Sequence, residues 1–390
     1  MRSVVAGIHR LSLPVVVVLS LATTVAAQDQ VLQRPTTESA QADDTVSSIE
    51  GGGYLDVGYL RSNNRPASHL WRSKSTSRIL DRLVVNNATV HVLKRSRSTS
   101  RLGFKAGLQA GKDVEALDTN SGDLGHALKY LNDTYVTYLA PIGDREVGLI
   151  GGLIPGHLGY ESFHAGDNPT YTRIYGVDNV PYFQWGAAAK YPYQGTVTGA
   201  VMVVSGWDYL ASANSAPSYG GRVHWDISGN AWLRGNVFYG PEQAETSLEF
   251  WRTAMELMGE IRIGDFELVG NVGWGKEKQA ALAGTPQYQW SWGALWLNWN
   301  PEGRPWSLGL RPEFFRDDDG LMTSARQTIT ALTAAVRYQM TTAKHRLQLR
   351  AEYRFDRSTG PDGGFFQGAG NVLVPEQHLF ILGVNWRIDT

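Results

Sequence analysis

Cysteine is absent from all 390 residues, which excludes disulfides, thiolate metal sites and cysteine nucleophiles. Neither sign of charge is in excess: the chain has 36 Lys and Arg and 37 Asp and Glu, which gives a formal net charge of −1. No bulk basic surface is therefore expected to hold nucleic acid. Beyond the N-terminal leader, no segment approaches the ~18 consecutive apolar residues of a membrane-spanning helix.

Residues 1–27 have the three parts of a secretory signal. Arg2 and Arg10 form the positive start, residues 11–22 form a short apolar stretch, and Val25-Ala26-Ala27 supplies small residues for cleavage. An uncleaved membrane anchor is the alternative, but the apolar stretch is too short to span a bilayer. We therefore expect the leader to be removed on export.

The chain is rich in glycine and aromatic residues: 43 Gly, 13 Trp, 17 Tyr and 12 Phe, with only 19% charged residues. This composition is typical of many strands rather than of a helical or α/β enzyme. From Gly51 onward, apolar and polar residues alternate. Near the C-terminus, for example, Leu349 and Ala351 alternate with Arg350 and Glu352. Side chains of a strand point alternately to its two faces, so such segments have one apolar and one charged face.

The alternation predicts about sixteen strands, most of them roughly nine to thirteen residues long, whereas a tilted bilayer-spanning strand needs about 9–11. The connections alternate between short and long along most of the chain, as periplasmic turns and external loops do in outer-membrane barrels. The predicted strands lie near 54–61, 83–93, 101–111, 130–140, 146–154, 181–191, 196–207, 219–228, 230–240, 250–263, 266–275, 288–299, 306–316, 328–340, 346–356 and 377–388.

A soluble β-sandwich also alternates, but two features favour an all-β transmembrane antiparallel barrel. Charged residues lie deep within long strands, which a water-filled lumen tolerates and a packed core does not. Aromatic residues cluster near strand ends, as in a lipid-facing girdle, and the same girdle explains the Trp-rich segment 288–299 more simply than a carbohydrate platform does. The candidate girdle residues are Tyr59, Tyr191, Trp207, Tyr239, Trp274, Trp299, Trp306, Tyr338 and Trp386.

Two stretches carry a family resemblance. The first is Gly148-Leu149-Ile150-Gly151-Gly152-Leu153-Ile154-Pro155, followed by Gly159-Tyr160-Glu161, Asp167-Asn168-Pro169 and Tyr171. The second is Leu310-Arg311-Pro312-Glu313-Phe314-Phe315-Arg316-Asp317-Asp318-Asp319-Gly320. Together they make the chain similar to the OmpL-like β-barrel porin family of the Gram-negative outer membrane, from about residue 51 to residue 388. The resemblance implies a pore for small hydrophilic solutes.

Three regions follow: residues 1–27 as signal peptide, 28–50 as a flexible periplasmic tail and 51–390 as the barrel. The third external loop, 155–180, is the longest, and by resemblance to general porins it is expected to fold inward and narrow the pore. Its constriction residues are expected to be Tyr160, Glu161, His164, Asp167, Asn168, Tyr171, Arg173 and Asp178. The charges expected to line the lumen are Arg101, Lys105, Lys190, Arg222, Arg234, Arg311, Glu313, Arg337, Arg346, Arg350, Glu352 and Arg354.

The loop is net acidic, whereas the lumen bases cluster late in the chain, at Arg311, Arg337 and Arg350 among others. Carboxylates opposite or beside an arginine wall would create a transverse field across the narrowest point. The alternative is that neighbours such as Glu313 and Glu352 neutralise these arginines.

Other chemistry is less well supported. His157, His164 and Asp167 match no compact metal motif, and Ser162, His164 and Asn168 match no compact hydrolase motif. Both groups fit a polar loop that borders water.

The acidic run Asp317–Asp319 suits an external Ca²⁺ site or, more simply, a solvated turn that ends at Gly320. No catalytic residue, cofactor or metal is expected.

The reading that best fits these observations is an outer-membrane porin that passes small hydrophilic solutes by passive diffusion, not an enzyme. The alternatives are an outer-membrane lipid hydrolase, which needs a Ser–His pair at the lipid-facing rim, and a structural or adhesive barrel with a plugged lumen. The expected partners are outer-membrane lipid, the solutes and the barrel assembly machinery. A homotrimer is expected by analogy with general porins.

Overall fold

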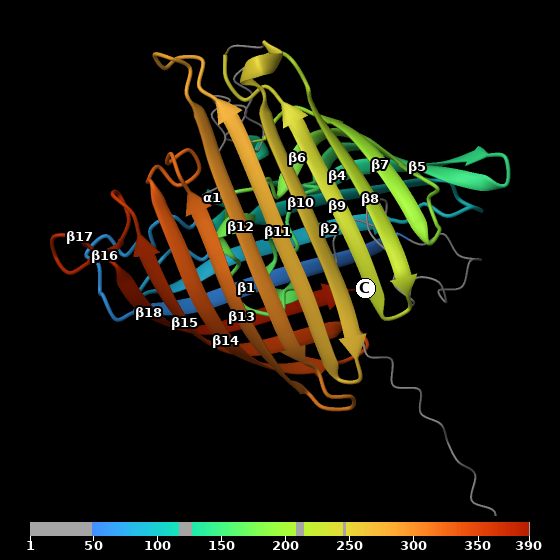
Figure 1. Cartoon of the computed structure of the whole chain (residues 1–390). Helices are drawn as coiled ribbons and strands as arrows, with labels where there is room; N and C mark the ends of the chain where they lie inside the picture. Colours follow the sequence, from blue (N-terminus) through green and yellow to red (C-terminus); the bar gives the residue numbers. More distant parts are fainter. Residues whose placement is uncertain (1–48, 116, 118–126, 208–213, 245–246, 390) are drawn as a thin grey trace, which may run out of the picture.

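The computed structural model describes residues 49–115, 117, 127–207, 214–244 and 247–389. The predicted signal peptide and nearly all of the predicted tail lie outside these ranges. Within them, sixteen long strands close into a single antiparallel barrel, in which each strand pairs with its neighbours in sequence and β18 pairs with both β15 and β1 (Figure 1). The predicted sixteen-stranded barrel is confirmed.

Each predicted strand corresponds to one observed strand, within a few residues at either end. In the described ranges, two short strands and several short helical segments lie in the connections and were not predicted. The barrel strands are β1 (Glu50–Ser62), β2 (Leu83–Lys94), β3 (Leu102–Ala110), β4 (Leu131–Ile142), β5 (Arg145–Pro155), β6 (Phe183–Tyr191), β7 (Val197–Val204), β8 (Ser218–Ser228), β9 (Ala231–Gly240), β10 (Arg252–Ile263), β11 (Phe266–Lys278), β12 (Gln287–Trp299), β13 (Trp306–Asp317), β14 (Gln327–Thr341), β15 (His345–Thr359) and β18 (Glu376–Asp389). The connections contain α1 (Lys112–Glu115), η1 (Ala165–Asp167), α3 (Tyr175–Asp178), η2 (Leu248–Phe250) and the hairpin of β16 (Phe365–Gln367) and β17 (Val372–Val374).

The two faces of the barrel differ as the alternation predicts. On β15, Leu349 and Tyr353 are 44% and 40% exposed on the outside, whereas Arg350 and Glu352 are buried on the inside. Strand pleating alone produces this separation, because successive side chains point to opposite faces of the sheet. The outside of the barrel is therefore an apolar band, and the inside carries most of the charge.

Long and short connections lie at opposite ends of the barrel (Figure 1). Residues 143–144, 229–230 and 264–265 form tight turns, whereas 63–82 and 156–182 are long. The first strand closes on the last with Gly52 opposite Asp389, so both ends of the barrel sequence lie on the side of the short turns. None of the helices in the described ranges has the length and apolar character needed to cross a membrane.

The girdle interpretation of segment 288–299 is wrong for most of its tryptophans. Trp290, Trp292 and Trp296 on β12 point inward and are buried, and only Trp299 lies on the outer face. Trp207, another girdle candidate, also lies inside, with its ring against Phe238 and Trp290. Other candidates, including Tyr191, Tyr239, Trp306 and Trp386, are exposed on the outside as predicted.

Glycines on the neighbouring strand make room for these inward tryptophans. Gly273 and Gly275 of β11 lie in register with Trp292 and Trp290, respectively. A Cβ atom at either glycine would overlap the indole ring beside it. The alternation alone did not predict this, because it assigns large apolar residues to the outer face and takes no account of space across the strand pair.

Substitutions on β15 test the facing of the strands. In a lipid bilayer, Leu349→Arg should lower the free energy of unfolding by about 2–4 kcal/mol, the range for a cation near the midplane. Arg350→Gln, on the adjacent inward position, keeps a hydrogen-bonding side chain in the polar interior and should therefore cost less than Leu349→Arg, although it loses contacts to the Gly166 and Asn168 carbonyls. Urea unfolding in lipid vesicles measures both, and equal losses would show that the faces are assigned wrongly.

Candidate functional site

The connection between β5 and β6, residues 156–182, lies inside the barrel and is here called the inner loop. Its residues contact inward-facing side chains of strands that are far apart around the barrel. The Gly159 amide donates to the Glu256 carboxylate of β10 at 3.0 Å, and the Tyr171 amide donates to Glu352 of β15 at 2.7 Å. In the barrel order, four strands separate β10 from β15 on one side, so the loop crosses the interior.

One side of the inner loop packs on an apolar part of the barrel wall. Its residues Leu158, Val177 and Val180 belong to the same buried cluster as Ile150 of β5 and Met202 of β7. The inner faces of β5–β7 thus depart from the polar character of the other strands. Apolar burial against this wall contributes about 25 cal/mol per Å² of area removed from water.

Tyr171 docks on the opposite wall in a notch that two glycines form. Gly58 of β1 and Gly383 of β18 are paired in register, and a Cβ atom on either would overlap the Tyr171 ring or its hydroxyl. The hydroxyl donates to Asp56 Oδ1 at 2.8 Å and accepts from Asn86 Nδ2 at 2.7 Å. The ring therefore lies against the strand backbone, and its hydroxyl both donates and accepts a hydrogen bond.

A bulge in β2 explains why Asn86 is available there. Asp56 pairs with Asn87 and Val57 with Val85, so Asn86 is an extra residue between them. Asn86 and Asn87 are both buried on the inside. A strict period of two would have placed one of them outside, so the bulge directs a second amide into the interior.

Acidic residues of the inner loop contact the arginines of the barrel wall directly. Glu161 pairs with Arg311 of β13 at 2.6 Å, with both side chains fully buried. Asp167 pairs with Arg387 of β18 at 2.7 Å and with Arg346 of β15 at 3.3 Å. Because these charges are in contact, the pairs neutralise each other and leave little charge separation to create the transverse field expected from the sequence.

The protonation states fit these contacts. Burial disfavours the charged form of Asp167, but Arg387 and Arg346 outweigh it and hold the pKa of that carboxyl below its usual range. Burial lowers the pKa of the neighbouring His164 to about 4, so this imidazole is neutral at pH 7. The net charge of this part of the loop therefore comes from Asp167 alone.

Glu313 and Arg354 join the middle of the loop to the wall. The Tyr175 amide donates to Glu313 at 2.9 Å, and Glu313 in turn pairs with Arg354 at 3.0 Å and with Arg311 at 3.1 Å. Arg350 donates to the Asn168 carbonyl at 2.9 Å. Glu313 thus neutralises Arg311 and Arg354, as the alternative hypothesis expects, whereas Arg350 and Arg337 bond to neutral groups.

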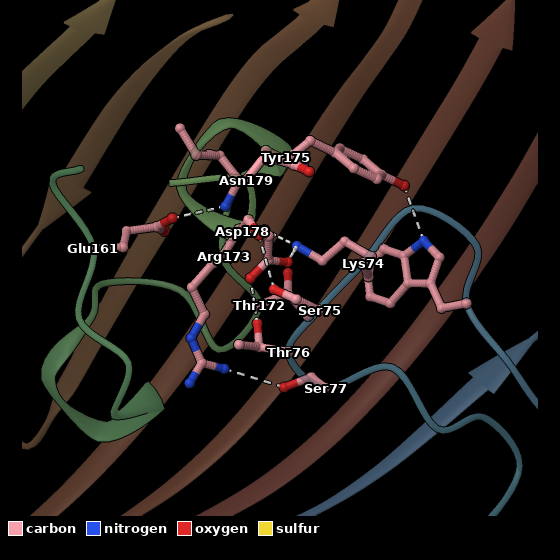
Figure 2. A network of polar contacts seen from close by, with 12 residues as sticks. Lys74, Ser75, Thr76, Ser77, Glu161, Thr172, Arg173, Tyr175, Asp178 and Asn179 are labelled. Carbon is pink, nitrogen blue, oxygen red and sulfur yellow. Dashed lines mark hydrogen bonds and ion pairs between the residues drawn. The ribbon is translucent and has the colours of Figure 1, made fainter. Parts of the chain in front are cut away.

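A second connection, residues 63–82 between β1 and β2, packs against the inner loop (Figure 2). Lys74 forms a buried ion pair with Asp178, and Thr76 donates to the same carboxylate at 2.7 Å. The Arg173 guanidinium donates to the Ser77 hydroxyl at 3.1 Å. The connection 63–82 and the inner loop are therefore joined to each other by an ion pair and hydrogen bonds.

All eight residues predicted for the constriction lie on the inner loop, and most of the predicted lumen charges reach it. Tyr160 packs against Trp296, and Arg222 donates to the His157 carbonyl at 2.7 Å. Five other predicted charges contact residues of the barrel strands and turns. Arg101 pairs with Glu146, Lys105 with Asp133, and Arg337 donates to Ser307. Lys190 lies over the Tyr193 ring, and Arg234 lies over the Trp232 ring and contacts His224.

Sequence reasoning missed several residues that hold the loop. Asp56 and Arg387 occupy inward positions of predicted strands, so the alternation could have identified them. Lys74 lies in a connection, where no periodic signal exists. Gly58 and Gly383 gave no signal, because their role depends on which side chain lies above them.

The structure also places the residues considered for metal or hydrolase chemistry. His157 lies near Gln184 and the Val237 carbonyl, away from the His164–Asp167 pair. Among the described residues, no group of three or more His, Asp or Glu side chains is placed to hold a metal ion.

The run that ends at Gly320 forms a hydrogen-bonded turn. Asp317 accepts from the backbone amides of Met322 and Thr323, at 3.0 and 2.7 Å. Asp318 pairs with Arg316 at 2.5 Å, and Asp319 accepts from the Gln289 amide at 2.9 Å. All three carboxylates thus have partners within the chain.

A closed sixteen-stranded barrel with an apolar outside, a charged inside and a loop across its interior has the architecture of the outer-membrane porins. A family model described as putative beta-barrel porin-2, OmpL-like, matches residues 48–387, so the chain belongs to this family. Family and fold together indicate an outer-membrane protein.

Solved structures share the fold at low sequence identity. The anion-selective porin from Comamonas acidovorans is 12% identical, with a TM-score of 0.56 over 88% of this chain and 99% of that chain. The outer membrane channel DcaP of Acinetobacter baumannii is 11% identical, with a TM-score of 0.54 over 88% of this chain and 96% of that one. A comparison with curated proteins finds no match.

A side chain in the glycine notch should displace Tyr171. We expect Gly383→Val to lower the free energy of unfolding by about 1–3 kcal/mol, the usual cost of overpacking a filled site. Gly235→Val is the matched control, since Gly235 also lies in a strand but has open space around its Cβ position. Denaturant unfolding of both variants makes the comparison. Equal losses in the free energy of unfolding for the two variants would show that the glycine notch does not contribute to stability.

Proposed function

We propose that this protein is an outer-membrane diffusion channel for small hydrophilic solutes and that the inner loop forms its constriction. The observation that carries the proposal is the inner loop itself, which crosses a barrel whose inner face is lined with Arg, Glu, Asp and Asn side chains. Membership in a porin family supports it. Barrels of this size generally enclose an aqueous channel.

Passive diffusion requires little chemistry from the protein. The apolar outer band holds the barrel in lipid, and the polar inner face keeps water in the lumen. The inner loop reduces the cross-section, so solutes are selected mainly by size. Because Glu161, Asp167 and Glu313 already pair with arginines, few uncompensated charges remain along the loop. Ion selectivity should therefore be weak.

Shortening the inner loop tests the proposed constriction. Deletion of residues 162–173 removes Tyr171 and Asp167 with their contacts, and single-channel conductance in planar bilayers should rise. The control is deletion of residues 281–284, in the exposed connection between β11 and β12, which should leave conductance unchanged. A folded 162–173 deletion variant with parental conductance would contradict the constriction.

A specific observation also favours a second candidate, a barrel with a plugged lumen. The inner loop and residues 63–82 bury each other's polar groups, including the Lys74–Asp178 pair. Such a barrel would serve a structural or adhesive role. It would show no conductance as the full chain, whereas the proposed channel conducts in the same recording.

The location and processing of the protein form a further part of the proposal. We expect residues 1–27 to be cleaved and the mature chain to fractionate with the outer membrane, after insertion by the barrel assembly machinery. Because a closed barrel resists unfolding, boiled and unboiled samples should migrate differently in detergent gels. Crosslinking before electrophoresis tests the homotrimer expected by analogy. A soluble periplasmic monomer would contradict the membrane assignment.

A further inference from the structure

Lys74 occupies an unusual place for a lysine. It lies in the connection between β1 and β2, yet its side chain has no solvent exposure, and neither does that of its partner Asp178. Its ammonium also donates to the Arg173 carbonyl at 2.6 Å. Both partners belong to the inner loop, so the Lys74 ammonium joins residues 63–82 to the inner loop at two residues (Figure 2).

Aromatic rings complete the surroundings of Lys74. The ammonium lies 5.0 Å from the ring centroid of Tyr175 and 5.3 Å from that of Trp71. Trp71 and Tyr175 are themselves joined, because the indole N–H donates to the tyrosine hydroxyl at 2.9 Å. Cation–π attraction strengthens when water is excluded, as it is here. The Asp178 carboxylate and the two rings together enclose the Lys74 ammonium, and the Arg354 guanidinium lies over the same two rings at 5.1 and 5.0 Å.

Neighbouring contacts converge on the same part of the inner loop. The Asp178 carboxylate accepts from Thr76 at 2.7 Å and from Tyr182 at 2.8 Å. Asp113 of α1 accepts from the Ser77 amide at 2.7 Å and lies 3.7 Å from the Arg173 guanidinium. The first three external connections therefore meet at residues 173–178 of the inner loop.

We propose that Lys74 is a positioning residue that fixes the inner loop within the barrel, so that residues 63–82 set the width of the channel. The statement about channel width rests on the proposed function, but the statement about loop position does not. Removing one member of a buried ion pair leaves the other charge uncompensated, which disfavours the packed arrangement far more than the loss of an exposed pair does. The loop would then leave its position to hydrate Asp178.

A cysteine reporter measures the loop position without relying on conductance. The chain has no cysteine, so Val177→Cys introduces a single thiol at a buried position of the inner loop. Its labelling by a small charged thiol reagent is followed in the full-length, membrane-inserted protein. Lys74→Met is combined with this reporter, as are Lys74→Arg and the double change Lys74→Met with Asp178→Asn. The matched control is Lys112→Met, which breaks an exposed ion pair with Glu115.

We expect Lys74→Met to speed the labelling at least tenfold. Lys74→Arg and the double change should label close to the parental rate, because the first keeps the cation and the second removes the unpaired anion. Lys112→Met should also match the parent. Parental labelling in Lys74→Met, or equally fast labelling in the control, overturns the positioning role.

Single-channel recording of the same variants separates this inference from the proposed function. Faster labelling together with a larger or fluctuating conductance in Lys74→Met supports both statements. Faster labelling with no conductance in any variant, the parent included, leaves the positioning role in place and overturns the channel. Faster labelling with unchanged parental conductance shows that the loop moves without setting the channel width, which overturns that half of the proposal.

Discussion

Pairing of β1 with β18 closes the barrel, and the arrangement of the interior depends on this closure. Once the sheet has no edge, alternate side chains of every strand must point into one enclosed space. That space receives arginines, carboxylates and amides, because the outer positions hold the apolar band. Closure also brings Gly58 beside Gly383. The notch that receives Tyr171 therefore exists only in the closed barrel.

The inner loop supplies ion-pair and hydrogen-bond partners for polar side chains that point into the closed barrel. A wall arginine such as Arg311 would be costly to leave without a partner, and Glu161 supplies one at 2.6 Å. Asp167 does the same for Arg387. The loop is therefore held by two kinds of force: apolar packing on the β5–β7 side and ion pairs on the β13–β18 side. Residues 63–82 add a third set of contacts, because they pack against the inner loop and bond to Arg173 and Asp178.

Close approach by glycine is a recurring device in this interior. Gly273 and Gly275 admit the rings of Trp292 and Trp290, and Gly383 admits Tyr171. The high glycine content by itself indicates only strands and turns, but at these positions glycine also leaves space for an aromatic ring against the strand backbone. The same device explains how a barrel can hold large inward side chains together with a loop.

The sequence by itself determined the barrel. Period-two alternation depends only on strand geometry, so the sixteen strands and the facing of Leu349 and Arg350 could be predicted. The length of the third long connection followed from the gap between two strands, whereas its inward fold was expected only from the family resemblance. The tertiary structure alone decided which residues meet. The ion pair between Glu161 and Arg311 joins residues 150 positions apart, and Lys74 has no periodic signal to mark it. The inward tryptophans were mispredicted because their placement depends on space left by glycines across a strand pair. Such space is a property of the folded neighbours and not of the local pattern.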